Sequence, residues 1–319
     1  MKARELVALS AESFEIREVD LPELGPLEIA IESEFGAAKH GTEVAGVKGY
    51  AGARGTFDPE TQVFMPPVAD PIPSGPRPVG NMIVGRVIAI GSDVTMFAIG
   101  DRVVAHSPFR DRTLVSAGRA WQIPDTVDWK TAVCLDPADF ALAAIRDGNV
   151  RVGDAVAVFG MGAIGLMAIQ IARVAGAGPI IAVDPIERRR NVAADTGATH
   201  VLDPTLCDAG LEIKRLTGNR GADVAVEHSG SMPALQAALR CVAFGGTVVA
   251  GAFPAPYGPG LDLGAEAHLN RPNIVFTRAV SDPNRDHPRW DDSRLFATCW
   301  DLFERGEISG ELVVTPVVE

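Results

Sequence analysis

One stretch constrains the fold more than any other, and it runs from residue 155 to residue 184: AVAVFGMGAIGLMAIQIARVAGAGPIIAVD. An apolar run leads into Gly160, Gly162 and Gly165, whose G-x-G-x-x-G spacing between a predicted strand and a predicted helix is typical of the phosphate-binding turn of doubly wound α/β domains. In such a turn Gly160 makes the tight bend, Gly162 lets a pyrophosphate approach the backbone, and Gly165 lets the helix pack closely on the sheet. The stretch therefore predicts a dinucleotide-binding domain.

Asp184 ends the next apolar strand, where an acidic side chain accepts both ribose hydroxyls of NAD. Its carboxylate would repel the 2′-phosphate of NADP, whereas Arg188 and Arg189 are near enough in the sequence to bind that phosphate. Ala163 and Ile164 begin the predicted helix, whose free N–H groups would face the phosphates. We expect NAD in preference to NADP; a glycine-rich turn that binds no nucleotide is the alternative.

The chain from about residue 150 alternates apolar runs with helical patterns. Fully apolar strands separated by helices predict a parallel sheet covered on both faces. Predicted helices start at Ala163 and span Glu187 to Thr196 and 232–242, and predicted strands include 179–184, 222–227, 246–253 and 273–280. A helix over 294–306 and a strand over 311–318 are expected at the end.

The first 130 residues follow a different pattern, with short alternating strands separated by turn residues. They predict an antiparallel, partly barrel-like β domain. Residues 49–78 are dense in Gly and Pro and predict a long loop. We expect a β domain at 1–130 and a dinucleotide-binding domain at 131–285.

Composition excludes several classes of function. The formal charge of −12 would repel a polyphosphate backbone, so we expect no nucleic-acid partner. No run approaches the roughly 20 apolar residues that span a bilayer, and the first residues lack a signal-peptide core. The four cysteines are widely spaced without a C-x-x-C pair, which favours free thiols in a reducing compartment. A cytoplasmic protein with no membrane partner is the expectation.

The segment FGAAKHGTEVAG, residues 35–46, gathers an ammonium, an imidazole, a hydroxyl and a carboxylate within five residues, at Lys39, His40, Thr42 and Glu43. These groups suit proton transfer and charge stabilisation. A solvated turn is the alternative interpretation. If the segment continues the preceding strand, Lys39 and His40 point to opposite faces and do not both reach one substrate.

The order of a β domain followed by a glycine-rich nucleotide-binding domain, with VGRVIAIG at 84–91, GDRVVA at 100–105 and GGTVVAGAF at 245–253, resembles the medium-chain dehydrogenase/reductase superfamily. The resemblance covers nearly the whole chain. It implies a GroES-like antiparallel β catalytic domain joined to a Rossmann domain, and an NAD-dependent alcohol dehydrogenase-like enzyme with a small-molecule substrate. It also implies a basic residue near the adenosine ribose at Arg189.

In zinc-dependent members of that superfamily a cysteine ligand stands where this chain has His40, and Thr42 matches the first hydroxyl of a proton relay. The second ligand motif aligns with Gly80, Asn81 and Met82, which lack its His and Glu, and the third position aligns with Asp136. Three good protein ligands are needed for catalytic zinc. We therefore expect no catalytic zinc, although a rebuilt or weaker metal site remains an alternative.

Without zinc, a side chain must take the hydroxyl proton and a cation must stabilise the developing alkoxide. His40 is the expected base, Thr42 the relay, Lys39 the stabilising cation, and Asp136 the group that orients His40. A histidine held by backbone in a turn is the alternative for His40.

Two further histidines are candidates for the site, one after a sheet strand and one in a loop of the β domain. His228 follows a predicted sheet strand, at the carboxyl end where ligands of such sheets bind, and is expected near the nicotinamide. Glu227 shares that place, although both residues could simply cap the next helix. His106 lies in the β domain, where an ordinary surface histidine is the favoured interpretation.

The leading hypothesis is hydride transfer between NAD(H) and a secondary alcohol or ketone of a polyol, sugar or cyclitol. An enoyl or quinone reductase that uses NADPH is the second hypothesis, and a non-catalytic dinucleotide-binding protein is the third. The resemblance also implies that the segment at 286–319 returns toward the first domain. It further implies a homodimer formed through the last strand of the nucleotide-binding domain, at 273–280, because an uncovered apolar sheet edge favours pairing with another chain.

Overall fold

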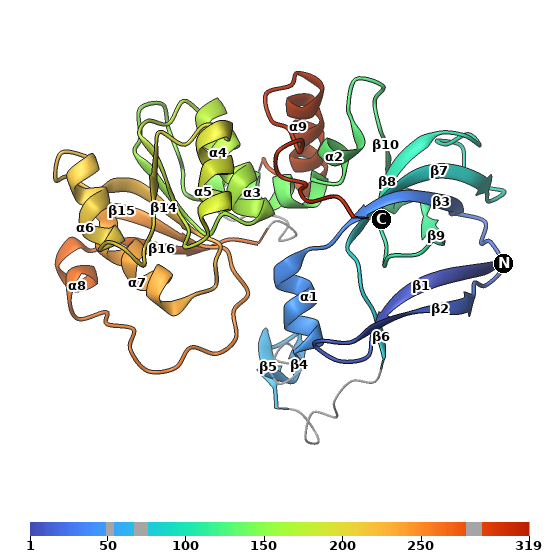
Figure 1. Cartoon of the computed structure of the whole chain (residues 1–319), viewed down its shortest axis with the longest axis horizontal. Helices are drawn as coiled ribbons and strands as arrows, with labels where there is room; N and C mark the ends of the chain where they lie inside the picture. The colour runs from blue at the N-terminus through green and yellow to red at the C-terminus, as the bar shows by residue number, and fades with distance from the viewer. Residues whose placement is uncertain (49–53, 67–75, 279–288, 319) are drawn as a thin grey trace. The chain divides into compact units, whose positions relative to one another are not determined.

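The computed structural model describes residues 1–48, 54–66, 76–278 and 289–318, without the side chains of His40, Thr42 and Val44. The chain forms two compact units, Met1–Val133 and Cys134–Glu319. Figure 1 labels most of their elements. In the described part of the chain, no helix is long and apolar enough to cross a membrane.

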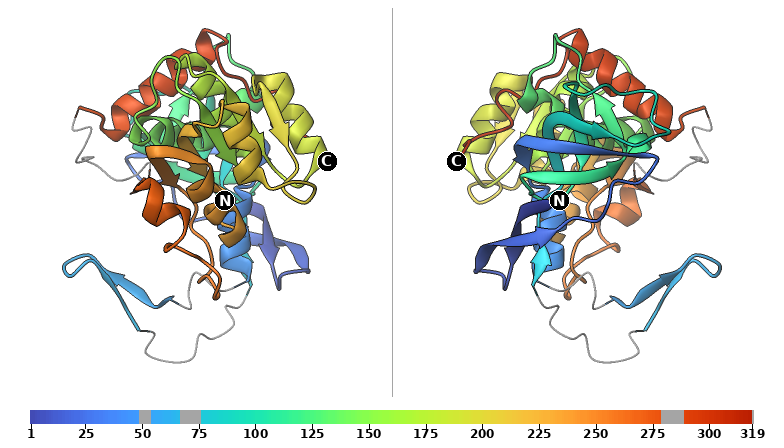
Figure 2. Two further views of the ribbon diagram at one scale, coloured as in Figure 1. Left: turned by 90° about the vertical axis from the view of Figure 1, so that its left-hand side faces the viewer. Right: turned by 90° about the vertical axis from the view of Figure 1, so that its right-hand side faces the viewer.

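The first unit is built on antiparallel strands, as its alternating sequence predicts. A five-stranded sheet has the order β10-β8-β7-β3-β9, and its curl is visible in the right-hand view of Figure 2. Ile29, Ile31, Ile83 and Val103 pack in its core because alternate side chains of each strand point to the same face. The strands of this sheet are β3 (Glu28–Ala37), β7 (Met82–Ile90), β8 (Arg102–His106), β9 (Arg112–Ser116) and β10 (Ala120–Gln122).

Smaller elements complete this unit. A three-stranded sheet has the order β2-β1-β6, and a separate hairpin joins β4 to β5. The hairpin falls within residues 49–78, which we expected to be a loop, so that expectation was wrong for this part of the segment. The elements are β1 (Lys2–Ala8), β2 (Phe14–Asp20), α1 (His40–Val47), β4 (Thr56–Asp58), β5 (Val63–Met65), β6 (Arg77–Pro78) and α2 (Trp129–Ala132).

The second unit is a doubly wound parallel sheet of six strands in the order β13-β12-β11-β14-β15-β16. Its central strands are fully buried, which explains their unbroken apolar sequence. The strands are β11 (Val156–Phe159), β12 (Ile180–Val183), β13 (His200–Leu202), β14 (Ala222–Glu227), β15 (Val242–Ala250) and β16 (Asn273–Phe276).

Helices lie on both sides of this parallel sheet (Figure 1). Helices α3, α4 and α5 pack in series on one side, and α6, α7 and α8 pack in series on the other, while α9 packs on α3. They are α3 (Leu135–Asp147), α4 (Ala163–Val174), α5 (Glu187–Thr196), α6 (Ala209–Leu216), α7 (Met232–Cys241), α8 (Glu266–Asn270) and α9 (Asp292–Glu304). The predicted start of α4 and the predicted span of α5 are confirmed.

The end of the chain differs from expectation. The strand predicted over 311–318 is wrong, because the N–H groups of Val313 and Val314 both bond to the carbonyl of Gly310 and form turns instead. Pro316 has no N–H to offer to a strand ladder. Residues 289–318 group with the second unit; the return segment and the boundaries at 130 and 285 remain predictions.

Candidate functional site

The glycine-rich turn joins the end of β11 to the start of α4. Gly160 has a φ of +91°, and a Cβ there would lie 2.8 Å from the backbone nitrogen of Ser229, so backbone conformation and packing both require glycine. A Cβ at Gly165 would overlap the carbonyl oxygen of Gly160. These two glycines therefore let strand, turn and helix pack closely together.

Gly162 is different, because nothing in the described part of the chain requires a glycine there. It is the N-cap of α4 with a φ of −77°, which any residue adopts, and a Cβ would meet no atom within 4 Å. The space beside it adjoins the first turn of the helix, at Ala163 and Ile164, where backbone N–H groups have no partner within the helix. This turn can hold an anion such as a pyrophosphate, with room for it to approach the backbone.

Asp184 lies beside the glycine-rich turn and is only 3% exposed. Its Oδ2 accepts a hydrogen bond from the N–H of Met161 at 2.7 Å, and its Oδ1 accepts one from the N–H of Ile186 at 2.8 Å. Arg189 Nη1 lies 3.8 Å from Oδ2. The structure thus brings Asp184 and Arg189 together at the turn, and each carboxylate oxygen retains lone-pair capacity for a further donor.

The other arginines of this helix differ in their surroundings. Arg190 Nη1 donates to the backbone carbonyl of Asp184 at 2.8 Å and pairs with Asp203 at 3.0 Å, so it stabilises the end of β12. Arg188 is exposed. Arg188 and Arg189 therefore remain the basic groups from this run that are available to a ligand at the ribose position.

The strand on the other side of β11 ends in Glu227 and His228. Glu227 is 1% exposed and accepts hydrogen bonds from the N–H groups of Ser229 and Gly230. Burial raises the pKa of its carboxyl, and these hydrogen bonds oppose the rise. Glu227 thus shapes the turn at Ser229 against which Gly160 packs.

His228 lies at the carboxyl ends of three neighbouring strands. A Cβ at Gly251 would overlap its imidazole and would lie 3.0 Å from the methyl group of Thr277. Glycine at 251 therefore makes room for the histidine. The ends of β12, β11 and β14 carry Asp184, the glycine-rich turn and His228 side by side, at the edge where open α/β sheets bind ligands.

The cluster at residues 39–43 belongs to the first unit, and it does not continue the preceding strand. Strand β3 ends at Ala37, and the N–H of Glu43 bonds to the carbonyl of Lys39, which begins helix α1. The side chains of His40 and Thr42 lie outside the described residues, so their proposed roles stay predictions. Lys39 is half-buried.

Sequence reasoning missed the surroundings of Glu43. Burial raises the pKa of its carboxyl, against a hydrogen bond from the backbone of Gly80 and the charge of Arg77. A Cβ at Gly46 would overlap the guanidinium of Arg77, so the glycine in "VAGV" makes room for that arginine. The sequence shows the glycine at position 46, but the helix around it was not predicted, and Arg77 lies 31 residues away and could not be identified as its partner from spacing.

A rebuilt metal site, the alternative to a zinc-free one, would draw on His40 and Asp136, with Asn81 or His106 as further ligands. Asp136 is buried in the first turn of α3, in the second unit, and His106 stacks edge-on against Trp121 in the first, with ring centroids 5.8 Å apart. Among the described side chains, no three His, Cys, Asp or Glu groups lie together as a metal site would require. The pairing of Asp136 with His40 remains a prediction.

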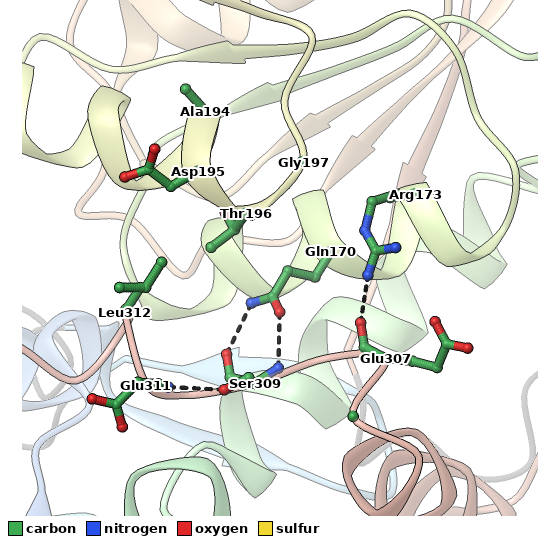
Figure 3. A pocket seen from close by; sticks show the side chains of 11 residues that line it. Gln170, Arg173, Ala194, Asp195, Thr196, Gly197, Glu307, Ser309, Glu311 and Leu312 are labelled. Carbon is green, nitrogen blue, oxygen red and sulfur yellow. Dashed lines mark hydrogen bonds between the residues drawn. The ribbon is translucent and has the colours of Figure 1, made fainter.

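A separate pocket of about 440 Å³ lies in the second unit between α4, α5 and the final segment (Figure 3). The carboxamide of Gln170 forms two hydrogen bonds with the backbone of Ser309, and Arg173 donates to the carbonyl of Glu307 at 2.6 Å. Its polar groups hold the end of the chain against α4. The pocket is therefore not the site at the glycine-rich turn.

Comparisons with known proteins agree with this architecture. A family model described as "Zinc-binding dehydrogenase" matches residues 163–282. D-guloside 3-dehydrogenase of Escherichia coli (strain K12) is 46% identical over 298 residues, covering 91% of this chain and 85% of that protein. Sorbitol dehydrogenase of Bacillus subtilis is 31% identical and covers 55% of this chain and 59% of its own length.

Solved structures show the same fold. The crystal structure of 2R,3R-butanediol dehydrogenase from Bacillus subtilis superimposes with a TM-score of 0.76 at 21% identity, covering 98% of this chain and 91% of that one. The first unit is therefore a GroES-like half-barrel and the second a Rossmann-like domain. The chain belongs to the medium-chain dehydrogenase/reductase superfamily and is an alcohol dehydrogenase-like oxidoreductase.

Proposed function

We propose that this protein transfers a hydride between NAD(H) and a secondary hydroxyl group of a sugar or sugar glycoside, forming the ketone in the oxidative direction. The observation that carries the proposal is the open space at Gly162 beside the buried Asp184. The substrate class is supported by the relative named D-guloside 3-dehydrogenase, which aligns with 91% of this chain. Sorbitol dehydrogenase supports the wider class of polyols.

The residues at the carboxyl edge of the parallel sheet fit a nicotinamide dinucleotide. The turn from Gly160 to Gly165 and the first N–H groups of α4 would bind the pyrophosphate. Asp184 would accept the hydroxyls of the adenosine ribose, with Arg189 beside it, and His228 would line the nicotinamide end. A carboxylate at the ribose favours NAD over NADP.

The chemistry divides between cofactor and protein. When bound, the nicotinamide takes the hydride from the carbinol carbon. His40 would take the hydroxyl proton through Thr42, and Lys39 would stabilise the alkoxide oxygen. Asp136 would orient the imidazole of His40. A reaction without catalytic zinc is proposed because Asn81 and Met82 stand where zinc-dependent relatives have the second ligand motif.

A homodimer is part of the proposal. Strand β16 ends the six-stranded order, and its Ile274 and Phe276 are 44% and 82% exposed. An uncovered apolar edge is a site for pairing with another chain. Replacing Phe276 by Lys should convert a dimer into a monomer in sedimentation analysis, with Leu206→Lys, at an equally exposed position away from this edge, as the control. A wild-type monomer would refute this assignment.

The test is binding followed by turnover. Wild-type protein should bind NADH more tightly than NADPH, measured by the change in dinucleotide fluorescence. With NAD it should oxidise glycosides at a secondary hydroxyl, and the ketone should be located by NMR. Reduction of enones or quinones with NADPH, without alcohol oxidation, would favour the second hypothesis instead. Binding of NADH without any turnover would favour a non-catalytic role.

A further inference from the structure

We propose that Asp184 is a positioning residue for the phosphate-binding turn, in addition to any contact that it makes with the ribose. The inference rests on the proposed function, because it assigns to the turn the pyrophosphate of a dinucleotide. It predicts that removing the Asp184 carboxylate weakens binding even of a dinucleotide that has no ribose hydroxyls for it to contact.

The sheet register sets Asp184 beside the turn. Val183 of β12 pairs with Phe159 of β11, and the N–H of Gly160 bonds to the carbonyl of Val183 at 2.9 Å. The next amide along the chain, at Met161, is beyond the sheet ladder and bonds to Asp184 Oδ2 instead. The carboxylate therefore continues the connection between the two strands by one residue, into the turn itself.

The amide of Met161 has no ready substitute for this acceptor. Met161 is 0% exposed, so its backbone N–H does not gain access to water without local opening. A buried N–H that loses its acceptor is costly, and the turn would have to rearrange to satisfy it. The rearrangement would occur between Gly160 and Gly162, which are the positions that must approach the pyrophosphate.

The two backbone amides that Asp184 binds each need a hydrogen-bond acceptor, one at each side-chain oxygen. Met161 donates to one oxygen and Ile186 to the other. An asparagine at 184 would set an NH₂ donor against one of these two N–H donors. Asp184→Asn therefore removes a hydrogen-bond acceptor as well as a charge. Replacing Asp184 alone should weaken the binding of both NAD and NADP and should not change the preference from NAD to NADP.

Binding of two ligands separates the positioning role from the ribose contact. The ligands are NADH and its analogue without the 2′- and 3′-hydroxyls on the adenosine ribose. Asp184→Asn should weaken the binding of both by roughly tenfold or more, a loss on the scale of one charge-assisted hydrogen bond. If the variant binds the dideoxy analogue as well as wild type does, the positioning role is refuted.

Asp223→Asn is the matched control. Asp223 accepts the N–H of Ala155 at 2.8 Å, so it is also a carboxylate bound to a backbone amide beside β11, but at the opposite end of that strand from the turn. This variant should leave the affinity for both ligands within about twofold of wild type. An equal loss in this control would show that general destabilisation explains the effect and would overturn the inference.

Amide hydrogen exchange of the protein without ligand gives a second, independent readout. The Met161 amide should exchange at least about tenfold faster in Asp184→Asn than in wild type, and at the wild-type rate in Asp223→Asn. Unchanged protection of Met161 in Asp184→Asn would refute the inference. If wild type bound neither dinucleotide, the proposed function would fail, while the exchange rates would still decide whether Asp184 holds the turn.

Discussion

Replacing Gly162 by Ala is the sharpest perturbation of the proposed cofactor site, because the structure separates its effects on stability and on binding. The backbone at Gly162 has φ −77° and ψ −173°, and an added Cβ meets nothing within 4 Å. The free energy of unfolding should therefore change by no more than about 0.5 kcal/mol. The added methyl group would occupy the space through which a pyrophosphate approaches the N–H groups of α4.

The expected loss of affinity follows from that geometry. If the methyl group displaces the phosphate from one charge-assisted hydrogen bond, the cost is about 1.5–3 kcal/mol, which corresponds to a Kd for NADH raised by roughly 10- to 150-fold. Fluorescence titration gives the Kd, and urea unfolding gives the stability. Gly165→Ala is the matched comparison, because its Cβ would overlap the carbonyl of Gly160 and should destabilise the fold by about 1–3 kcal/mol.

One result would refute this reasoning. If Gly162→Ala keeps the wild-type stability and the wild-type Kd for NADH, no ligand atoms approach this part of the turn. The glycine-rich turn would then have only a packing role.

Three further predictions address the chemistry and its pH dependence. His40→Ala should lower kcat by roughly 10²- to 10⁴-fold with the Kd for NADH unchanged, as expected for loss of a general base; an unchanged kcat would remove His40 from the mechanism. Burial raises the pKa of the Glu227 carboxyl above its ordinary 4.5. The contribution of this raised pKa to the free energy of unfolding is therefore complete below about pH 4.5, and it is lost as the pH rises through the raised pKa and the carboxyl ionises. As the pH rises above about 4.5, the free energy of unfolding in urea should therefore fall less for Glu227→Gln than for wild type, and parallel pH profiles would contradict this assignment. Protein purified without chelator should contain far less than one zinc per chain by elemental analysis and keep its activity in EDTA, whereas one tightly bound zinc per chain would show that the ligand set has been rebuilt.

The sequence predicted the second unit well, because local signals and the global fold agree there. Unbroken apolar runs identified the buried strands, and glycine spacing placed the start of α4 at Ala163. The start of α1 was harder to predict. Lys39 and His40 follow an alternating strand, and the helix that begins there is seen only in the structure, where the N–H of Glu43 bonds to the carbonyl of Lys39.

Long-range contacts explain most of what the sequence did not reveal. The apolar residues of "ELVVTPVV" match a strand pattern, but no strand among the described residues of the chain pairs with them. Asp184 was predicted as a ribose ligand from its place after a strand. Its bond to Met161 depends on the register between β11 and β12, which a single sequence does not specify.

The measurement that tests the central claim most directly is the formation of reduced nicotinamide when the protein is mixed with NAD and a hexoside. We predict an increase in the near-ultraviolet absorbance of NADH, a slower reaction with NADP, and a product with one ketone at a secondary carbon of the sugar. No reduced nicotinamide from any sugar, polyol or simple secondary alcohol, from protein that binds NADH, would contradict the claim.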